Sequence, residues 1–155
     1  MPPETTPTET TPWLDAREQS AWRAYVETVG DLTSALEADL APTGLSLGDY
    51  QVLVYLSEAD ERRMRMCDLA QALQLSPSGL TRRLDGLVRS GLVGREGSPA
   101  DRRVMLAVLT DAGWDALRTA APVHVESVRR RIFDHLTPDQ VDAMAAIFRA
   151  IGAEL

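Results

Sequence analysis

The chain has 155 residues, a length that suits one domain with one core, and its hydrophobic and charged fractions of 45% and 25% are those of an ordinary globular protein. No apolar run reaches the roughly 18 residues of a membrane span and no basic, apolar leader opens the chain, so we expect a cytoplasmic protein without a membrane partner. The single cysteine, Cys67, excludes an internal disulfide, and with only two histidines we expect no metal site and no cofactor.

The net charge of −7 is unevenly distributed along the chain. Residues 62–103 contain nine arginines against four acidic residues, a net charge of +5, whereas the rest of the chain carries −12. A local positive field is sufficient to attract phosphate, so the acidic total does not exclude a nucleic-acid partner. A solvated charged surface is the alternative interpretation of this basic segment.

Periodicity divides the chain into the elements of a mostly α protein with a small β-hairpin. Apolar residues at three- and four-residue steps predict helices, and short apolar runs beside turn residues predict strands. A proline- and threonine-rich opening predicts a disordered tail. In chain order, we expect the tail at 1–12, a long helix at about 13–40, a helix at about 46–58, a very short strand at 64–66, short helices at about 67–74 and 76–90, strands at 92–96 and 103–109, and helices at about 111–134 and 138–153.

Several boundaries follow from residues that start or stop helices. Gly91 is expected to end the helix at 76–90, and Pro122 to kink the helix at 111–134. Four hydroxyl residues have the position of helix N-caps, two of them with the spacing of a capping box. They are Ser46 with Asp49, Ser76 before Pro77, Thr110 before the helix at 111–134, and Thr137 with Gln140.

The helix at 76–90 has two contrasting faces. One is an apolar stripe that must face the core. The other carries hydroxyl and arginine side chains, which can bind base edges and phosphate. Together with the short helix before it, this is a helix-turn-helix arrangement, in which the second helix reads the major groove of double-stranded DNA. The candidate DNA contacts on it are Ser76, Ser78, Thr81, Arg82, Arg83 and Arg89.

The predicted hairpin adds a second candidate contact, a wing at 97–103. Arg102 and Arg103 follow Asp101 at its tip, and a cationic tip suits the narrow minor groove, where negative potential is concentrated. We expect Asp101 to pair with one arginine side chain while the other enters the groove. The alternatives are a surface turn with a local ion pair, or a winged helix that binds protein instead of DNA.

Between Leu45 and Gly113 the sequence resembles the multiple-antibiotic-resistance regulator (MarR) family of bacterial winged-helix proteins. The stretches that carry the resemblance, in the family's order and spacing, are Leu69-Ala70, Leu75–Arg82, Leu87–Val93, Asp101–Arg103 and Leu109–Gly113. The Asp-x-Arg pattern of the family's wing points to Arg103 as the arginine in the groove. Gln74 departs from the family, which often has glycine at this turn; if the position is left-handed, glutamine costs roughly 1 kcal/mol. Gly79 also departs, because a hydroxyl residue is more usual there.

The resemblance implies a transcription regulator that binds a pseudo-palindromic, inverted-repeat operator as a homodimer, most commonly as a repressor. It implies a single domain over 13–155, with a DNA-binding lobe at about 46–110 and dimerisation helices at about 13–40 and 111–155. It also implies control by a small molecule or by redox chemistry. No nucleophile and base, phosphate loop or ligand cluster is evident, so we do not expect an enzyme.

The resemblance places a ligand site between the first, second and fifth helices. Aromatic residues with a few polar groups there suit a small aromatic or phenolic effector. The candidate ligand-binding residues are Trp22, Arg23, Tyr25, Asp49, Tyr50 and His124. Trp22 and Tyr25 lie on the apolar stripe of the first helix, where core packing is the expected role and ligand contact the alternative.

The single cysteine and the two histidines are candidates for a second role. Cys67 is predicted at the N-cap of a short helix, where a thiolate is favoured, so a redox-sensing regulator is an alternative function. Because cysteine is among the most buried residue types, we expect Cys67 to fill the core instead. At helical rise His124 and His135 are ~16 Å apart, too far to share a metal ion within one chain, and a symmetric site across a dimer is the alternative.

Overall fold

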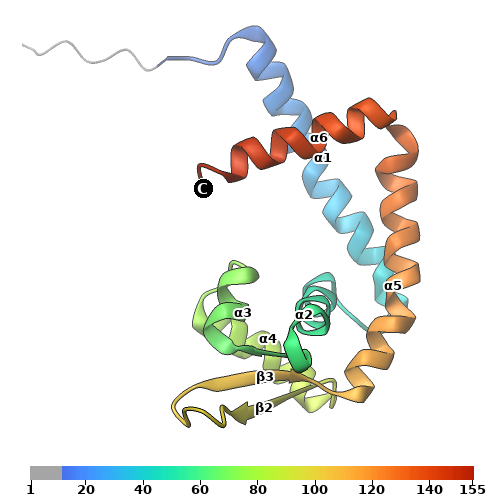
Figure 1. The fold of residues 1–155 in the computed structure, drawn as a ribbon. Helices are drawn as coiled ribbons and strands as arrows, with labels where there is room; N and C mark the ends of the chain where they lie inside the picture. Colours follow the sequence, from blue (N-terminus) through green and yellow to red (C-terminus); the bar gives the residue numbers. More distant parts are fainter. Residues whose placement is uncertain (1–11) are drawn as a thin grey trace, which may run out of the picture. The chain divides into compact units, whose positions relative to one another are not determined.

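The computed structural model describes residues 12–155, so the predicted tail at 1–12 lies outside the described residues except for Pro12. The chain divides into two compact units, residues 1–34 and 35–155, and the helix α1 (Ala16–Leu40) begins in the first and ends in the second. The remaining elements are η1 (Ala41–Thr43), α2 (Leu47–Glu58), η2 (Asp60–Arg62), β1 (Arg63–Arg65), α3 (Met66–Ala72), α4 (Pro77–Arg89), β2 (Val93–Gly97), β3 (Met105–Leu109), α5 (Asp111–Arg131), η3 (Phe133–His135) and α6 (Pro138–Gly152) (Figure 1). The predicted class, mostly α with a small β-hairpin, is confirmed.

The hydroxyl N-caps that the sequence predicts are all present. The hydroxyl of Ser46 accepts from the backbone N–H of Asp49, whose carboxylate in turn accepts from the N–H of Ser46. The same reciprocal pair of hydrogen bonds joins Thr137 and Gln140 at the start of α6. Ser76 caps α4 by accepting from the backbone N–H of Gly79 at 3.1 Å. These side chains satisfy N–H groups that a first helical turn leaves without partners.

Several predicted boundaries are wrong by one to three residues, including the start of α1, which is Ala16 instead of 13. The strand β3 begins at Met105 instead of 103, because a turn at Asp101 includes Arg103 and Val104. The helix α5 ends at Arg131 instead of 134, since Ile132 leaves helical geometry and the 3₁₀ turn η3 follows. The helix α3 begins one residue early, so its N-cap is Arg65 and not Cys67. The helix α5 continues through Pro122.

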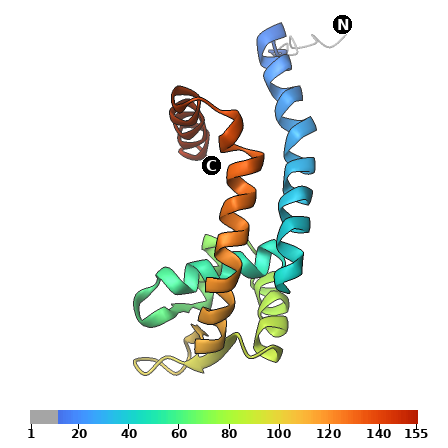
Figure 2. The ribbon, with the colours of Figure 1, turned by 90° about the vertical axis from the view of Figure 1, so that its right-hand side faces the viewer.

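The core lies where α2, α3, α4 and the first half of α5 meet the sheet. In the described part of the chain, this sheet is antiparallel with the strand order β1-β3-β2. Leucines dominate the buried positions, as expected of helices that each turn one apolar stripe inward. Side chains with almost no exposure come from α2, α3, α4 and the sheet: Val52, Leu53, Leu56, Leu69, Leu80, Leu84, Val93 and Ala107. Figure 2 shows α4 and the hairpin at the same end of this unit.

A tight junction fixes the start of α5 against the sheet. The hydroxyl of Thr110 donates to the carbonyl of Gly91 at 2.7 Å and accepts from the N–H of Gly113 at 3.0 Å. A Cβ at Gly113 would lie 2.0 Å from the carbonyl oxygen of Leu92, so only glycine allows this approach. This geometry gives a physical reason for the Leu-Thr-x-x-Gly pattern that ends the family resemblance.

A second junction joins the end of α1 to the last turns of α5. The carboxylate of Asp39 accepts from Arg131 Nε at 2.6 Å, from Arg130 Nη2 at 3.0 Å and from the hydroxyl of buried Ser127. The hydrogen bonds from Arg131 and Ser127 hold the pKa of Asp39 well below its usual value.

Among residues 12–155, no helix is long and apolar enough to cross a lipid bilayer.

Candidate nucleic-acid interface

The helix α4 places its two faces as the sequence predicts. Leu80, Leu84 and Leu87 are at most 3% exposed and form its core-facing stripe. The opposite face turns toward solvent, and its exposed residues include Ser78, Thr81, Arg82 and Arg89. An exposed face of small hydroxyl residues followed by arginine can approach base edges closely and donate to them.

The polar residues of α4 differ in how far they are already engaged. Thr81 donates to the carbonyl of Pro77 at 2.9 Å, and Arg89 Nε donates to the carbonyl of Asp85 at 3.2 Å. The hydroxyls of Ser76 and Ser78 lie 3.3 Å apart. Arg82 makes no side-chain hydrogen bond or ion pair with any residue of the described chain. Its five donors are therefore available to an external acceptor.

Arg83 lies on a different side of α4. Its guanidinium packs over Gly48, where an added Cβ would lie 1.9 Å from Nη1, and it pairs with the carboxylate of Asp49 at 3.6 Å. Arg83 therefore faces α2 and holds α4 against the start of α2. Asp49, a predicted ligand residue, is engaged both by this pair and by the capping box.

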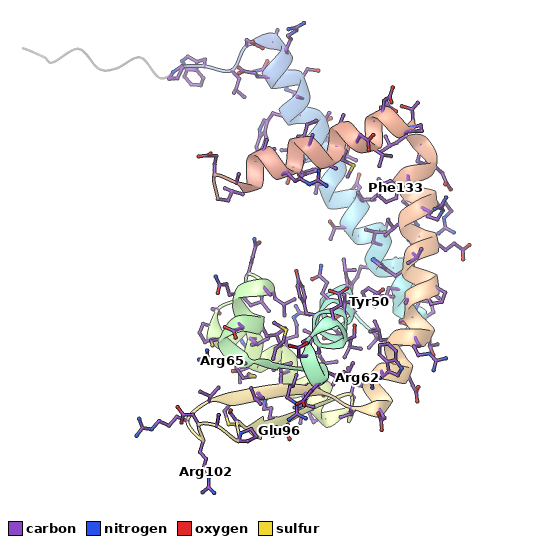
Figure 3. The ribbon with its side chains drawn as sticks, viewed as in Figure 1. Tyr50, Arg62, Arg65, Glu96, Arg102 and Phe133 are labelled. Atoms are coloured by element: carbon purple, nitrogen blue, oxygen red, sulfur yellow. The ribbon has the colours of Figure 1, made fainter. Side chains whose placement is uncertain are left out.

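The hairpin tip differs from the expected arrangement. Asp101 accepts from the backbone N–H of Arg103 at 2.9 Å and forms no ion pair with either arginine side chain in the part of the chain described. The expected Asp101–arginine ion pair is therefore wrong, because the carboxylate closes the turn instead. Both arginines are exposed, and Figure 3 shows Arg102 projecting from the hairpin.

The wing is fixed to α4 by a residue that the sequence analysis did not select. Arg95 on β2 donates from Nη2 to the carboxylate of Asp85 at 2.8 Å and to the carbonyl of Thr81 at 3.0 Å. Across the sheet, Arg63 on β1 donates to Glu96 on β2 at 2.8 Å. The sequence signal for this contact was an acidic residue in the middle of α4, Asp85, together with a basic residue on β2, Arg95.

The turn between α3 and α4 is left-handed. Gln74 has φ = +54°, so the condition under which glutamine is expected to cost free energy at this turn is met. A second strained turn precedes β1, where Glu61 and Arg62 also have positive φ. The guanidinium of Arg62 lies 4.4 Å from the ring centre of Trp114, which fixes this turn to the first turns of α5.

Comparison with known proteins agrees with this geometry. A sequence model of the MarR family matches residues 43–104, the segment that contains the helix-turn-helix, β2 and the tip of the hairpin. The solved structure of AbsC, a MarR family transcriptional regulator from Streptomyces coelicolor, is 42% identical, covers 93% of this chain and 97% of its own, and has a TM-score of 0.89. The chain belongs to the MarR family of transcriptional regulators.

Two further relatives extend the comparison. Sco3205, a MarR family regulator from Streptomyces coelicolor whose structure was solved in complex with DNA, is 38% identical with a TM-score of 0.90, covering 96% of this chain and 93% of its own. The HTH-type transcriptional repressor YetL of Bacillus subtilis (strain 168) is 27% identical over 115 residues, 74% of this chain and 69% of its own. These relatives and the family are DNA-binding transcription regulators, not enzymes.

In this MarR family protein, two of the predicted ligand-binding residues, Tyr50 and His124, line one pocket. An open pocket of about 430 Å³ lies against α2 and α5, and the rings of Tyr50 and His124 are 4.6 Å apart at its wall. Burial lowers the pKa of His124 and raises the pKa of Tyr50. The Nδ1 atom of His124 is buried without a hydrogen-bond partner in the described residues. The full lining is Leu36, Leu47, Tyr50, Gln51, Val54, Tyr55, Glu58, His124 and Val128.

Three expected positions of side chains are corrected. Trp22 and Tyr25 are 57% and 48% exposed, so the expected core packing of these rings is wrong for the single chain. Arg23 is exposed beside them. Cys67 is exposed and not buried, because α3 begins at Met66 and turns its second residue outward. Its thiol donates to the carboxylate of Asp68 at 3.6 Å.

Proposed function

We propose that this MarR family chain represses transcription as a homodimer that binds an inverted-repeat operator. In this proposal α4 enters the major groove of each half-site, and residues 97–103 form the wing that enters the adjacent minor groove. Arg82 carries the proposal: it is exposed, opposite a buried leucine stripe, and without an internal partner in the described chain. The net charge of +5 over residues 62–103 supplies the field that attracts phosphate.

The DNA contacts we propose are a subset of the predicted residues. Ser76, Ser78, Thr81, Arg82 and Arg89 lie at the start or on the exposed face of α4, and Arg102 and Arg103 lie on the wing. Arg83 is left out because its side chain already packs on α2. That Sco3205 was solved with DNA, and that YetL is called a repressor, support operator binding and repression for this chain.

The dimer is supported by the apolar face of α6. None of the residues of this helix is buried in the single chain. Ile147, Phe148 and Ile151 are 50% to 55% exposed, and Phe133 in η3 is 38% exposed. An exposed apolar face of this kind marks an interaction surface. We infer that the equivalent face of a second copy covers it, as a two-fold interface requires.

Arginine substitutions test operator binding. An inverted-repeat duplex selected by the wild-type protein from random DNA serves as the probe, and affinity is measured by fluorescence anisotropy over a salt series. Arg82→Ala should weaken binding by about 1–3 kcal/mol for each half-site contact and leave Tm nearly unchanged. Arg118→Ala is the matched control, because Arg118 is an exposed arginine on α5, outside the interface. Unaltered affinity of Arg82→Ala would show that α4 does not face the DNA.

The wing is tested in the same assay. Arg102→Ala combined with Arg103→Ala should weaken binding to the selected duplex and to a scrambled duplex alike, since minor-groove arginines sense width more than base identity. The slope of log K against log salt should fall by roughly one unit per lost cation in each half-site. If slope and affinity both stay at the wild-type values, the hairpin is not a DNA wing and a protein-binding role gains support.

We further propose that a small aromatic or phenolic effector binds the pocket at Tyr50 and His124. The pocket has the volume of a small-molecule site, and the rings of Tyr50 and His124 at its wall suit packing against an aromatic ring. A panel of phenols and aromatic acids should contain members that weaken operator binding. His124→Ala removes one of the two rings, so it should blunt that response while basal DNA affinity persists. A flat response of the wild-type protein to the whole panel would leave these residues as core.

A further inference from the structure

An open hollow separates β1 and α3 from the base of the wing. Its volume is about 290 Å³, and it is lined by Arg65, Met66, Cys67, Arg103, Val104 and Met105. Arg65 is the last residue of β1, and Figure 3 shows it at the end of the domain toward which the hairpin extends. Arg103 of the wing thus lies on one side of the hollow, and Arg65, outside the wing, lies on the other.

Both arginines are exposed, and neither guanidinium makes a hydrogen bond or ion pair with the described residues. The nearby acids have other partners. Glu96 shares a cross-strand row with Arg65, since both pair with Leu106 of β3, but its carboxylate accepts from Arg63 at 2.8 Å. Asp101 accepts from a backbone N–H of the turn, and Asp68 from the thiol of Cys67. The positive charge at the hollow therefore has no internal counter-ion among the described residues.

We propose that Arg65 binds the phosphate backbone of DNA at the edge of the minor groove that the wing enters. The two walls of a minor groove are the phosphate-bearing strands. If the wing lies in the groove, Arg65 on the other side of the hollow lies beside one of these strands. A guanidinium is suited to this role because its planar donors match two phosphate oxygens. Arg65 would add affinity and fix the approach of the wing without reading bases. This inference rests on the proposed DNA-binding function.

The test compares Arg65→Ala, Arg65→Lys and the control Arg118→Ala on the selected duplex and on a scrambled duplex over a salt series. Arg65→Ala should lower the slope of log K against log salt by about one unit per half-site, or about two for the dimer. Affinity should fall by the same factor on both duplexes. Arg65→Lys should retain the slope, because it keeps the charge. Tm should stay near the wild-type value, since the exposed guanidinium has no hydrogen bond or ion pair with the described residues to lose.

Arg82→Ala is measured in parallel to separate two kinds of failure. If Arg65→Ala leaves slope and affinity unchanged while Arg82→Ala weakens binding, the role of Arg65 is overturned and the proposed function stands. If Arg65→Ala weakens only the selected duplex, Arg65 is not a backbone contact and the inference also fails. If no arginine substitution changes binding to either duplex, the proposed function fails and the role of Arg65 fails with it.

Discussion

The helices α4 and α6 begin alike and end in different environments. Each starts with a hydroxyl N-cap followed by proline, and each carries an apolar stripe at helical spacing. The stripe of α4 is at most 3% exposed at Leu80, Leu84 and Leu87, whereas Ile147, Phe148 and Ile151 of α6 are at least 50% exposed. The comparison shows that an apolar stripe specifies burial but not the surface that provides it. Its own chain covers α4, and we propose that a second copy covers α6.

Removal of α6 should produce the largest effect. A chain lacking residues 137–155 should be monomeric or aggregated, because the surface proposed to hold the dimer is lost and the face it covers is exposed. Light scattering at several protein concentrations measures the state. A truncated protein that remains a folded dimer would place the interface elsewhere and remove the contrast between the two helices.

One truncated aliphatic side chain on each helix should separate the two environments. Leu84→Ala should lower the free energy of unfolding by about 2–5 kcal/mol, because it leaves a cavity in the core of the single chain. Ile147→Ala should change the stability of the separated chain little and instead weaken the dimer, so its effect on denaturation should depend on protein concentration. Denaturant unfolding over a concentration series distinguishes them. Equal, concentration-independent losses would mean that both positions belong to one intrachain core.

The N-caps provide a smaller and matched comparison. Ser76→Ala should cost about 1 kcal/mol of global stability, since α4 unfolds with the core. Thr137→Ala removes an equivalent hydrogen bond, yet it should appear as faster amide exchange in the first turn of α6 and not as a global loss. Ser20→Ala, at an exposed position in α1 that caps no helix, controls for the loss of a hydroxyl. A full global loss from Thr137→Ala would show that α6 unfolds cooperatively with the core of its own chain.

The turn that leads into α4 gives the smallest prediction. Gln74 has φ = +54°, whereas the residue before α6, Thr137, has an ordinary extended backbone. Gln74→Gly should therefore stabilise the protein by up to about 1 kcal/mol, measured as a rise in Tm. Gln71→Gly, inside α3, should destabilise by about the same amount, because glycine is a poor helix former. A fall in Tm with Gln74→Gly would mean that the glutamine side chain stabilises the turn by another route.

Much of the reading face could be derived from local signals. Ser76, Pro77 and the leucines at helical spacing determine where α4 starts and which face it buries, because capping and periodicity act within a few residues. The engagement of individual arginines could not be derived. Arg83 and Arg82 are neighbours with the same chemistry, but the backbone turns one toward Asp49 and the other toward solvent. Arg95 became a wing anchor only because β2 packs beside Asp85 on α4.

The sequence alone therefore determined the order of the elements, their caps and the family to which the chain belongs, since these depend on short-range spacing. Only the tertiary structure decided which charged side chains are already paired and that Trp22 and Cys67 are exposed. It alone also showed that the buried Nδ1 of His124 has no hydrogen-bond partner among the described residues. These properties depend on contacts between segments far apart in the chain. Burial and ion pairing are set by which surfaces meet, and hydrophobic periodicity contains no record of the partner surface.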